Sequence, residues 1–181
     1  MTDDTELRIL EDEGAAKHLQ NISIPEISLP NQEGNLLRLV RSDTFRMVLY
    51  FFPLTGRPDK PLPDNWNNIP GAKGCTIEAC TFRDNYDEII SLNAVPIGIS
   101  TQTVIHNKEM TSRLSIPYDV LSDEKLELQT SLNLPIFSIK DKNYLKRLTL
   151  IVEKNIIKKV FYPIYSVDKH IEEVLKWLKI N

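Results

Sequence analysis

The two cysteines of the chain, Cys75 and Cys80, lie at the start of a segment with helical periodicity. We place Cys75 at a helix N-terminus, where unpaired backbone N–H groups and the helix dipole favour an anion. This position predicts a thiol with a lowered pKa, present in part as the nucleophilic thiolate. The competing interpretation is a buried, unreactive cysteine, since a free cysteine packs like a small apolar residue. The apolar face of the predicted helix comprises Ala79, Phe82, Tyr86, Ile89 and Ile90.

The spacing of the two cysteines limits how they could bond. In a regular helix, five residues correspond to a rise of ~7.5 Å and a rotation of ~140°. The Cα atoms would then lie ~8–9 Å apart, beyond the ~7 Å limit for a disulfide. The pair can therefore bond only if the first helical turn unwinds, which suits a disulfide that cycles. Zinc and a Cys–His hydrolase are not favoured, because the histidines show neither ligand spacing nor an obvious strand-end position; they are His18, His106 and His170.

The elements around the cysteines alternate between strands and helices. A βαβ unit followed by a ββα unit predicts an α/β thioredoxin-like fold, with a central mixed β-sheet flanked by helices and an N-terminal β-hairpin. The expected elements are a hairpin of residues 24–30 and 36–40, a strand at 46–52, a helix from 76 to about 92, a strand at 95–100, a helix at 101–114, a strand at 118–121, a helix from its cap Ser122 to about 132, a loop from Pro135, a hairpin of 148–152 and 156–162, and a helix from about 166. A short helix is also expected at 15–19.

A long proline-rich loop, residues 54–73, separates the first buried strand from Cys75. Loops of this length inside a compact domain are uncommon and are usually functional or mobile. Trp66 has two interpretations that the sequence leaves open. It is either the packing anchor of a surface insertion or part of a surface that contacts a substrate or partner.

Composition sets the outer limits of the function. With 181 residues, 41% of them hydrophobic and 26% charged, the chain is expected to form one globular domain. Residues 1–14 hold six acids and one base, so we treat 1–21 as an acidic extension and 22–181 as the domain. The net charge of −3, less the −5 of residues 1–14, leaves +2, which argues against an extended nucleic-acid surface. No apolar run reaches the roughly 20 residues that span a bilayer, and the acidic start is unlike a signal peptide, so a cytoplasmic protein without membrane contact is expected.

The segment at residues 74–84, Gly-Cys-Thr-Ile-Glu-Ala-Cys-Thr-Phe-Arg-Asp, resembles the active-site segment of peroxiredoxins. The type that it resembles most is the bacterioferritin-comigratory-protein or peroxiredoxin Q type. A strand ending Tyr-Phe-Phe-Pro precedes it, and residues 95–100, 118–123 and 147–152 match in order. The resemblance covers roughly residues 22–180. It implies a thioredoxin-like fold and reduction of hydroperoxides without metal, haem or other cofactor.

Four residues receive roles from this resemblance or from their chemistry. By position, Cys75 matches the peroxidatic cysteine, and Cys80 matches the resolving cysteine that this type keeps on the same helix. Arg147 matches the arginine that holds the thiolate and the peroxide, and a permanent guanidinium does favour a thiolate. Gly74 has no side chain and would let a small substrate approach the backbone N–H groups beside the thiol.

The chain departs from the family pattern upstream of the first cysteine. Asn68 and Ala72 stand where the family has a proline and a threonine. Alignment by the strand end instead makes Pro53 the motif proline and adds about 15 residues to the loop. Thr55 is then the candidate for the threonine that binds the peroxide, and Pro70 is a candidate for the proline that shields the site.

The resemblance implies an antioxidant thiol peroxidase that reduces hydrogen peroxide and organic hydroperoxides. Its cycle would form a sulfenic acid at Cys75, resolve it to a Cys75–Cys80 disulfide, and reduce that disulfide with thioredoxin or a similar dithiol donor. A monomer is expected, with a homodimer as the alternative. Two other functions stay open: a redox sensor or interaction module using the same cysteines, and a peroxiredoxin-like scaffold that lost catalysis with the threonine.

Overall fold

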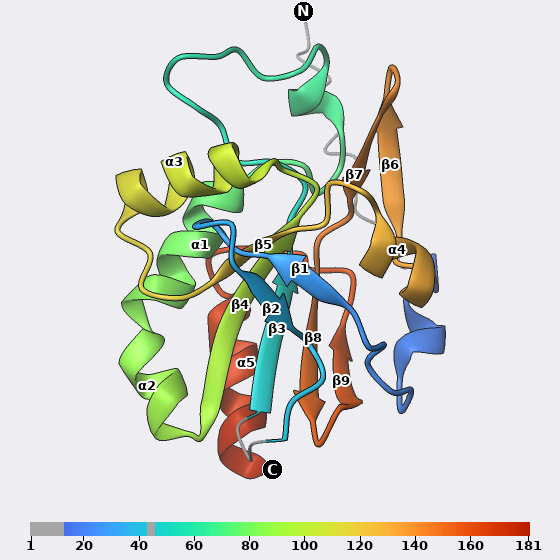
Figure 1. Cartoon of the computed structure of the whole chain (residues 1–181), viewed down its shortest axis with the longest axis vertical. Helices are drawn as coiled ribbons and strands as arrows, with labels where there is room; N and C mark the ends of the chain where they lie inside the picture. The colour runs from blue at the N-terminus through green and yellow to red at the C-terminus, as the bar shows by residue number, and fades with distance from the viewer. Residues whose placement is uncertain (1–12, 43–45) are drawn as a thin grey trace, which may run out of the picture.

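A computed structural model describes residues 13–42 and 46–181 of the chain. Its centre is one mixed five-stranded sheet (Figure 1). The strands are, in spatial order, β5 (Val120–Ser122), β4 (Ala94–Ser100), β3 (Arg46–Phe51), β8 (Leu148–Glu153) and β9 (Ile156–Phe161). β3, β4 and β5 are parallel, whereas β8 is antiparallel to both β3 and β9. The predicted central mixed sheet is therefore confirmed.

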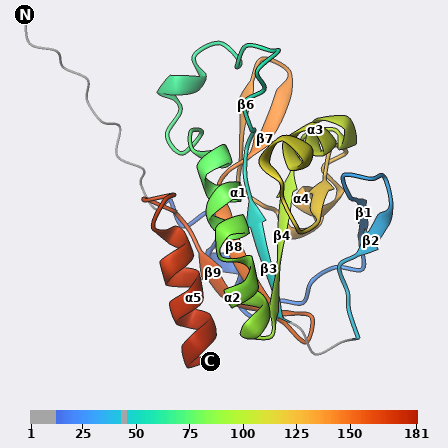
Figure 2. The same ribbon diagram turned by 90° about the vertical axis from the view of Figure 1, so that its left-hand side faces the viewer.

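Helices cover both faces of this sheet (Figure 2). One face is covered by α1 (Cys75–Asp84), α2 (Tyr86–Ser91) and α5 (His170–Ile180). The other face is covered by α4 (Glu127–Leu132) and the hairpin of β1 (Ser28–Pro30) and β2 (Leu36–Arg38). α3 (Val104–Leu114) contacts the edge strand β5, and its Met110 is buried in the same core as α1 and α5. Two apolar cores, one on each side of the sheet, result from this arrangement.

The central strand β3 supplies both cores because its side chains alternate between the two faces. Val48 and Tyr50 enter the core beneath α1 and α5, while Leu49 and Phe51 enter the core on the α4 side. All four are fully buried. This central position explains the continuous apolar run of the sequence. It also means that the chain leaves β3 at one end of the sheet and returns there to begin α1 (Figure 1).

The two predicted hairpins are confirmed. β1 and β2 pair antiparallel near the N-terminus, and β8 and β9 pair around a turn at Lys154 and Asn155, both with positive φ. The short helix predicted at 15–19 is a 3-10 turn, Lys17–Leu19, with Leu19 buried. Most of the predicted acidic extension, residues 1–12, lies outside the described residues.

The helix predicted from 76 to about 92 is two helices, because Asn85 ends the first one. The backbone N–H and the side-chain NH2 of Asn85 both donate to the carbonyl of Thr81, at 3.2 and 2.8 Å. A side chain that bonds its own helix terminus in this way competes with continuation of the helix. α2 then begins at Tyr86.

The prediction that Ser122 caps the following helix is wrong. Ser122 is the last residue of β5, and α4 begins only at Glu127. The carboxylate of Asp123 accepts the backbone N–H groups of Leu128 and Gln129 at 3.1 and 2.9 Å. Asp123 therefore satisfies the N–H groups that open α4.

Two further boundaries differ from the predictions. Pro135 precedes a hairpin, β6 (Ile136–Ile139) and β7 (Lys142–Leu145), where a loop was expected. Each strand has only four residues and packs one side against the 54–73 insertion, so its apolar pattern is too short to identify. The last helix, α5, begins at His170, four residues after the expected start near 166.

Trp66 anchors the insertion, residues 54–73, to the β6–β7 hairpin. It lies in a short 3-10 turn (Trp66–Asn68) and is 3% exposed. Its ring centroid lies 5.1 Å from that of Tyr144 and 5.7 Å from that of Phe137. Ala72, close to the first cysteine in sequence, is buried in the same cluster. The packing interpretation of Trp66 is thus confirmed.

Replacing Trp66 with alanine should release the insertion while leaving the sheet folded. Truncating a buried tryptophan costs about 3–5 kcal/mol in a main core. Here the cluster is separate from both cores, so we expect the loss to appear as local opening. Amide hydrogen exchange should rise at residues 57–72 and stay unchanged in β3 and β4.

Leu62→Ala is the matched control, because Leu62 lies in the same insertion and is 41% exposed. It should leave the exchange pattern unaltered. Faster exchange throughout the sheet in Trp66→Ala would contradict a locally anchored insertion.

Candidate active site

Cys75 is the first residue of α1, and its side chain is buried. The residue is 3% exposed and belongs to the core between the sheet, α1 and α5. Gly74 precedes it with φ of 96°, a left-handed conformation that favours glycine. A Cβ on Gly74 would also lie 3.2 Å from a methyl carbon of Val167. The segment before α5 therefore packs closely against the start of α1.

Arg147 brings a buried positive charge to this thiol from the junction of β7 and β8. One of its terminal nitrogens lies 3.1 Å from Cys75 Sγ and also donates to the carbonyl of Lys73 at 2.9 Å. Arg147 is itself only 4% exposed. Two residues that are 72 positions apart in the sequence are therefore in direct contact. The sulfur also lies 3.5 Å from the carbonyl of Ala72.

Glu78 completes the site, although sequence reasoning did not identify it. Its carboxylate pairs with the other terminal nitrogen of Arg147, and both side chains are almost fully buried. Oε1 of Glu78 has no hydrogen-bond partner among the described residues. Burial raises the pKa of Glu78 to about 7, against the lowering effect of Arg147. The available signal was its spacing: Glu78 follows Cys75 by three positions, on the same side of α1.

The thiol of Cys75 is governed by opposing effects. Burial is the largest and raises its pKa, and the charge of Glu78 acts in the same direction. The guanidinium of Arg147 and a hydrogen bond from the backbone N–H of Leu54 lower the pKa. The net direction is upward, so the predicted lowering at the helix start is wrong here. The local field of a helix terminus is outweighed because the core and insertion exclude water from the sulfur.

Cys80 lies on the same helix and is half-buried, and both cysteines are free thiols. α1 is helical from Cys75 to Asp84, so the separation of ~8–9 Å predicted between the Cα atoms of the two cysteines in a regular helix applies. A disulfide between the two cysteines would need the first turn of α1 to open. That turn is closed by a hydrogen bond from the backbone N–H of Glu78 to the carbonyl of Gly74, at 2.9 Å.

The remaining predicted site residues lie around the loop that leads to the thiol. Pro53 is buried two residues after the end of β3, whereas Pro70 is exposed on the insertion. Thr55 is 1% exposed, and its hydroxyl donates to the side chain of Gln102 at 2.9 Å. It also lies 3.5 Å from His106 Nε2. The hydroxyl of Thr55 is thus engaged by α3 and the residues before it.

Two structural findings concern other classes of site. Within residues 13–42 and 46–181, no group of three or more His, Cys, Asp or Glu side chains is arranged to hold a metal ion. In the same ranges, none of the helices combines the length and apolar character needed to cross a membrane.

Comparison with known proteins places this geometry in a family. The profile of the AhpC/TSA family matches residues 67–160, more than half of the chain. The chain is 29% identical over 167 residues to chloroplastic peroxiredoxin Q of Arabidopsis thaliana, covering 91% of this chain and 68% of that protein. It is 29% identical over 155 residues to a putative peroxiredoxin bcp of Coxiella burnetii, covering 83% of this chain and 92% of the relative.

Solved structures agree with this assignment. Peroxidoxin BcpB from Mycobacterium tuberculosis aligns with a TM-score of 0.73 and 26% identity, over 89% of this chain and 96% of its own. A cysteine-to-serine mutant of PrxQ from Xylella fastidiosa aligns with a TM-score of 0.72 over 89% and 95%, and at 18% identity it supports the fold alone. The predicted thioredoxin-like fold is therefore confirmed. The chain belongs to the AhpC/TSA family and is a peroxiredoxin, an oxidoreductase related to the Q and bcp types.

Proposed function

We propose that this peroxiredoxin reduces hydroperoxides with Cys75 as the peroxidatic thiol, Arg147 as its anion-binding partner and Cys80 as the resolving thiol. The observation that carries the proposal is the 3.1 Å approach of the Arg147 guanidinium to Cys75 Sγ inside a buried site. A permanent cation at this distance stabilises a thiolate and the negative charge that develops on peroxide oxygen. The names of the relatives, peroxiredoxin Q and bcp, support the same class of substrate.

The first chemical step oxidises Cys75. The thiol loses its proton, and the sulfur attacks the terminal oxygen of the hydroperoxide. An S–O bond forms while the O–O bond breaks, leaving a sulfenic acid and an alcohol, or water, that takes up a proton. Because burial opposes ionisation of this thiol, the Arg147 guanidinium and the Leu54 N–H supply the compensating stabilisation of the thiolate.

The second step forms a disulfide within α1. The Cys80 sulfur attacks the Cys75 sulfenic sulfur, an S–S bond forms, and the S–O bond breaks with release of water. This step requires the first turn of α1 to unwind, because the helical separation exceeds disulfide reach. A dithiol donor of the thioredoxin class would then reduce the disulfide by thiol–disulfide exchange.

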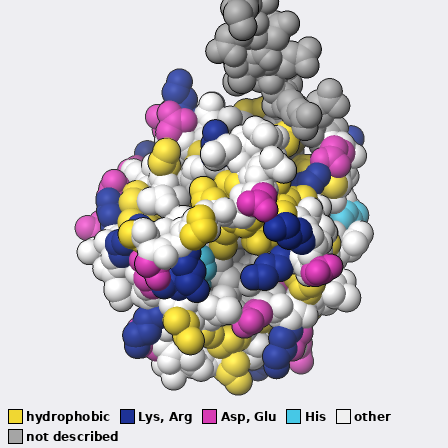
Figure 3. Space-filling model, turned by 90° about the horizontal axis from the view of Figure 1, so that it is seen from above, with side chains coloured by type: hydrophobic (Ala, Val, Ile, Leu, Met, Phe, Trp, Pro, Cys, Tyr) yellow, Lys and Arg dark blue, Asp and Glu magenta, His cyan; other side chains and the backbone are white. Residues whose placement is uncertain are grey.

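The surface around the insertion suits a protein or small-molecule partner better than a nucleic acid. On the face seen in Figure 3, basic and acidic side chains are interspersed with apolar ones. A nucleic-acid surface would instead present a continuous basic stripe. The redox-sensor alternative uses the same cysteines, and sustained turnover distinguishes it from an enzyme.

Replacement of either cysteine should give distinct results in a peroxide-consumption assay with a thioredoxin system. Cys75→Ser should abolish activity, because it removes the sulfur that attacks the peroxide. Cys80→Ser should consume about one equivalent of peroxide per chain and then recycle poorly, because the sulfenic acid has no partner on α1. The sulfenic acid is detected by dimedone labelling of residue 75.

The controls separate enzyme from sensor. Thr76→Ser, between the two cysteines, should keep wild-type turnover. Full turnover by Cys75→Ser would contradict the proposal, and normal cycling by Cys80→Ser would exclude Cys80 as the resolving thiol. A wild-type protein that forms the disulfide once and is never recycled by dithiols would favour the sensor.

Arg147→Met should raise the pKa of Cys75 further and slow its reaction with peroxide and with iodoacetamide. Loss of a charged hydrogen bond of typical strength corresponds to about tenfold in thiolate population at pH 7. Lys146→Met is the matched control, since Lys146 is an adjacent cation that pairs with Glu13 at the surface. Equal reactivity of Arg147→Met and wild type would contradict a role for the guanidinium at the sulfur.

Arg147→Met should also change how stability depends on pH. The pKa of Glu78 is raised from 4.5 to about 7, so the folded state keeps a proton that the unfolded state loses in that interval. The free energy of unfolding should therefore fall as pH rises through it. Without Arg147 the pKa of Glu78 should be higher still, so the free energy of unfolding should continue to fall to higher pH. Breaking the buried Glu78–Arg147 pair should also lower the stability, since such a loss typically costs about 3–5 kcal/mol.

The pH dependence of the free energy of unfolding would be measured by urea unfolding of Arg147→Met between pH 5 and 9. Wild type and Lys146→Met would be measured in the same way for comparison. The double variant Glu78→Gln/Arg147→Met should recover part of the stability, because residue 78 then no longer carries an ionisable carboxyl. It should stay slow toward peroxide. Wild-type peroxide reactivity in the double variant would show that the pair acts on folding alone.

A further inference from the structure

The turn that leads into α5, residues 165–169, lies against the start of α1. Val167 is half-buried and is the one residue of this turn that is not exposed. Its two methyl carbons would lie only 3.2 and 3.3 Å from a Cβ on Gly74, so its side chain fills the space beside that glycine. The carbonyl of Gly74 accepts the N–H of Glu78 at 2.9 Å and closes the first turn of α1. Val167 therefore restrains the turn that must open before a disulfide can form.

We infer that His170 is a positioning residue for the resolving step, because it holds the 165–169 turn on β8 and so keeps Val167 against Gly74. Opening of the first turn of α1 then requires the 165–169 turn to move away. This inference rests on the proposed function and concerns what controls the rate of disulfide formation at the same site.

The side chain of His170 joins the start of α5 to the sheet and to α1. It is 1% exposed, and its Nε2 lies 2.8 Å from the hydroxyl of Thr149. Its Nδ1 lies 3.3 Å from the carboxylate of Glu173, which only accepts, so in the neutral ring Nδ1 carries the hydrogen and the Thr149 hydroxyl donates to Nε2. The ring also lies edge-on to Phe82 of α1, with centroids 6.5 Å apart. α1 and α5 are neighbours on the same face of the sheet (Figure 2).

Thr149 is a fixed anchor because it lies inside the sheet. It is fully buried in β8, opposite Tyr50 of β3 and Phe161 of β9. Arg147, two residues earlier, faces the same side of the sheet, as the alternation of side chains along an extended chain requires. One segment of the chain thus carries the guanidinium that contacts the Cys75 sulfur and the hydroxyl that holds His170.

The backbone of the turn connects the position of His170 to that of Val167. The N–H groups of Lys169 and His170 both donate to the carbonyl of Ser166, at 3.2 and 2.9 Å. These two bonds close the backbone around Val167, which lies between the donor and acceptor residues. The anchored end of the turn therefore fixes the side chain that contacts Gly74.

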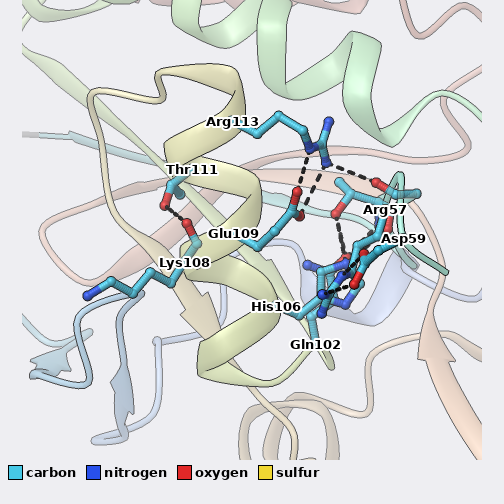
Figure 4. Close-up of polar contacts among 10 residues, drawn as sticks. Arg57, Asp59, Gln102, His106, Lys108, Glu109, Thr111 and Arg113 are labelled. Atoms are coloured by element: carbon cyan, nitrogen blue, oxygen red, sulfur yellow. Dashed lines mark hydrogen bonds and ion pairs between the residues drawn. The ribbon is translucent and has the colours of Figure 1, made fainter.

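The start of the insertion is held by different contacts (Figure 4). His106 Nε2 lies 3.0 Å from the carbonyl of Thr55, and Arg113 donates to the carbonyl of Gly56 at 2.9 Å while paired with Glu109. These contacts come from α3 and do not depend on the bond between α5 and β8. Loss of that bond should therefore loosen the start of α1 and leave residues 54–57 protected.

The first test measures amide hydrogen exchange of the reduced, full-length protein and needs no peroxide. Thr149→Val keeps the shape of the residue but removes the hydroxyl that binds His170, and Val167→Ala removes the methyl groups beside Gly74. Exchange of the Glu78 N–H should be about tenfold faster in Thr149→Val and about fivefold faster in Val167→Ala. Exchange at residues 54–57 should equal that of wild type.

The second test follows both chemical steps after one equivalent of hydrogen peroxide, by rapid quenching and mass spectrometry. In both variants the sulfenic acid should form at the wild-type rate, because the contact of Arg147 with the sulfur is retained. Its conversion to the disulfide should accelerate by the same factors as exchange, since Cys80 reaches Cys75 only while the first turn is open. A wild-type rate of conversion in variants with faster exchange would overturn control of this step by the turn.

Val174→Ala is the matched control for Val167→Ala, since Val174 is fully buried on α5 in the core shared with α1. It should lower the overall stability but leave exchange of the Glu78 N–H and the rate of disulfide formation unchanged. Equal acceleration in Val174→Ala, or wild-type exchange in Val167→Ala, would overturn the inference. Because Val167 is only half-buried, its variant decides even if Thr149→Val does not fold. Exchange reports on the turn even if Cys80 is not the resolving thiol, so the inference and the proposed function can fail separately.

Discussion

The structure of the site depends on one buried guanidinium shared between two acidic groups. Arg147 contacts the thiol of Cys75 and pairs with the carboxylate of Glu78, and all three side chains are within the interior. A charge in such a place is stable only when its partners are present. Burial opposes ionisation of both the thiol and the carboxyl, while Arg147 favours ionisation of both. The acidity of the thiol is therefore set by a balance between these effects.

The fold holds Cys75, Glu78 and Arg147 together in the reduced protein, and opening of the first turn of α1 would separate them. The chain enters α1 through Gly74, whose left-handed conformation and contact with Val167 fix the start of the helix. Glu78 lies between the two cysteines on the same helix, so opening the first turn for a disulfide would also move this carboxylate away from Arg147. In our proposal, oxidation thus rearranges the charge pair together with the helix. Tyr118 donates to the carbonyl of Ala79 at 2.8 Å, which braces the helix just beyond that turn.

Much of the fold follows from local patterns in the sequence. The buried run that forms β3 and the two hairpins β1–β2 and β8–β9 could be predicted, because their apolar periodicity is strong. The division between α1 and α2 and the cap of α4 could not, since each depends on one side chain, Asn85 or Asp123, that bonds to particular backbone groups. The β6–β7 hairpin was missed because its strands are short and pack on the insertion.

The site was predictable in part. The resemblance to peroxiredoxins led to the pairing of Cys75 with Arg147, which the structure brings into contact. Glu78 was not identified, because its pairing with Arg147 is a tertiary contact that a sequence pattern does not reveal. The direction of the thiol pKa was predicted wrongly for the same reason. A helix terminus is a local feature, whereas burial depends on the core, α5 and the insertion together.

The proposed mechanism is tested most directly by treating the reduced wild-type protein with one equivalent of hydrogen peroxide and mapping the product by mass spectrometry and hydrogen exchange. We expect an intramolecular disulfide between Cys75 and Cys80, with amide protection lost at residues 75–80 and kept in α2. Oxidation that stops at Cys75 without a disulfide, or a disulfide formed only between chains, would contradict it.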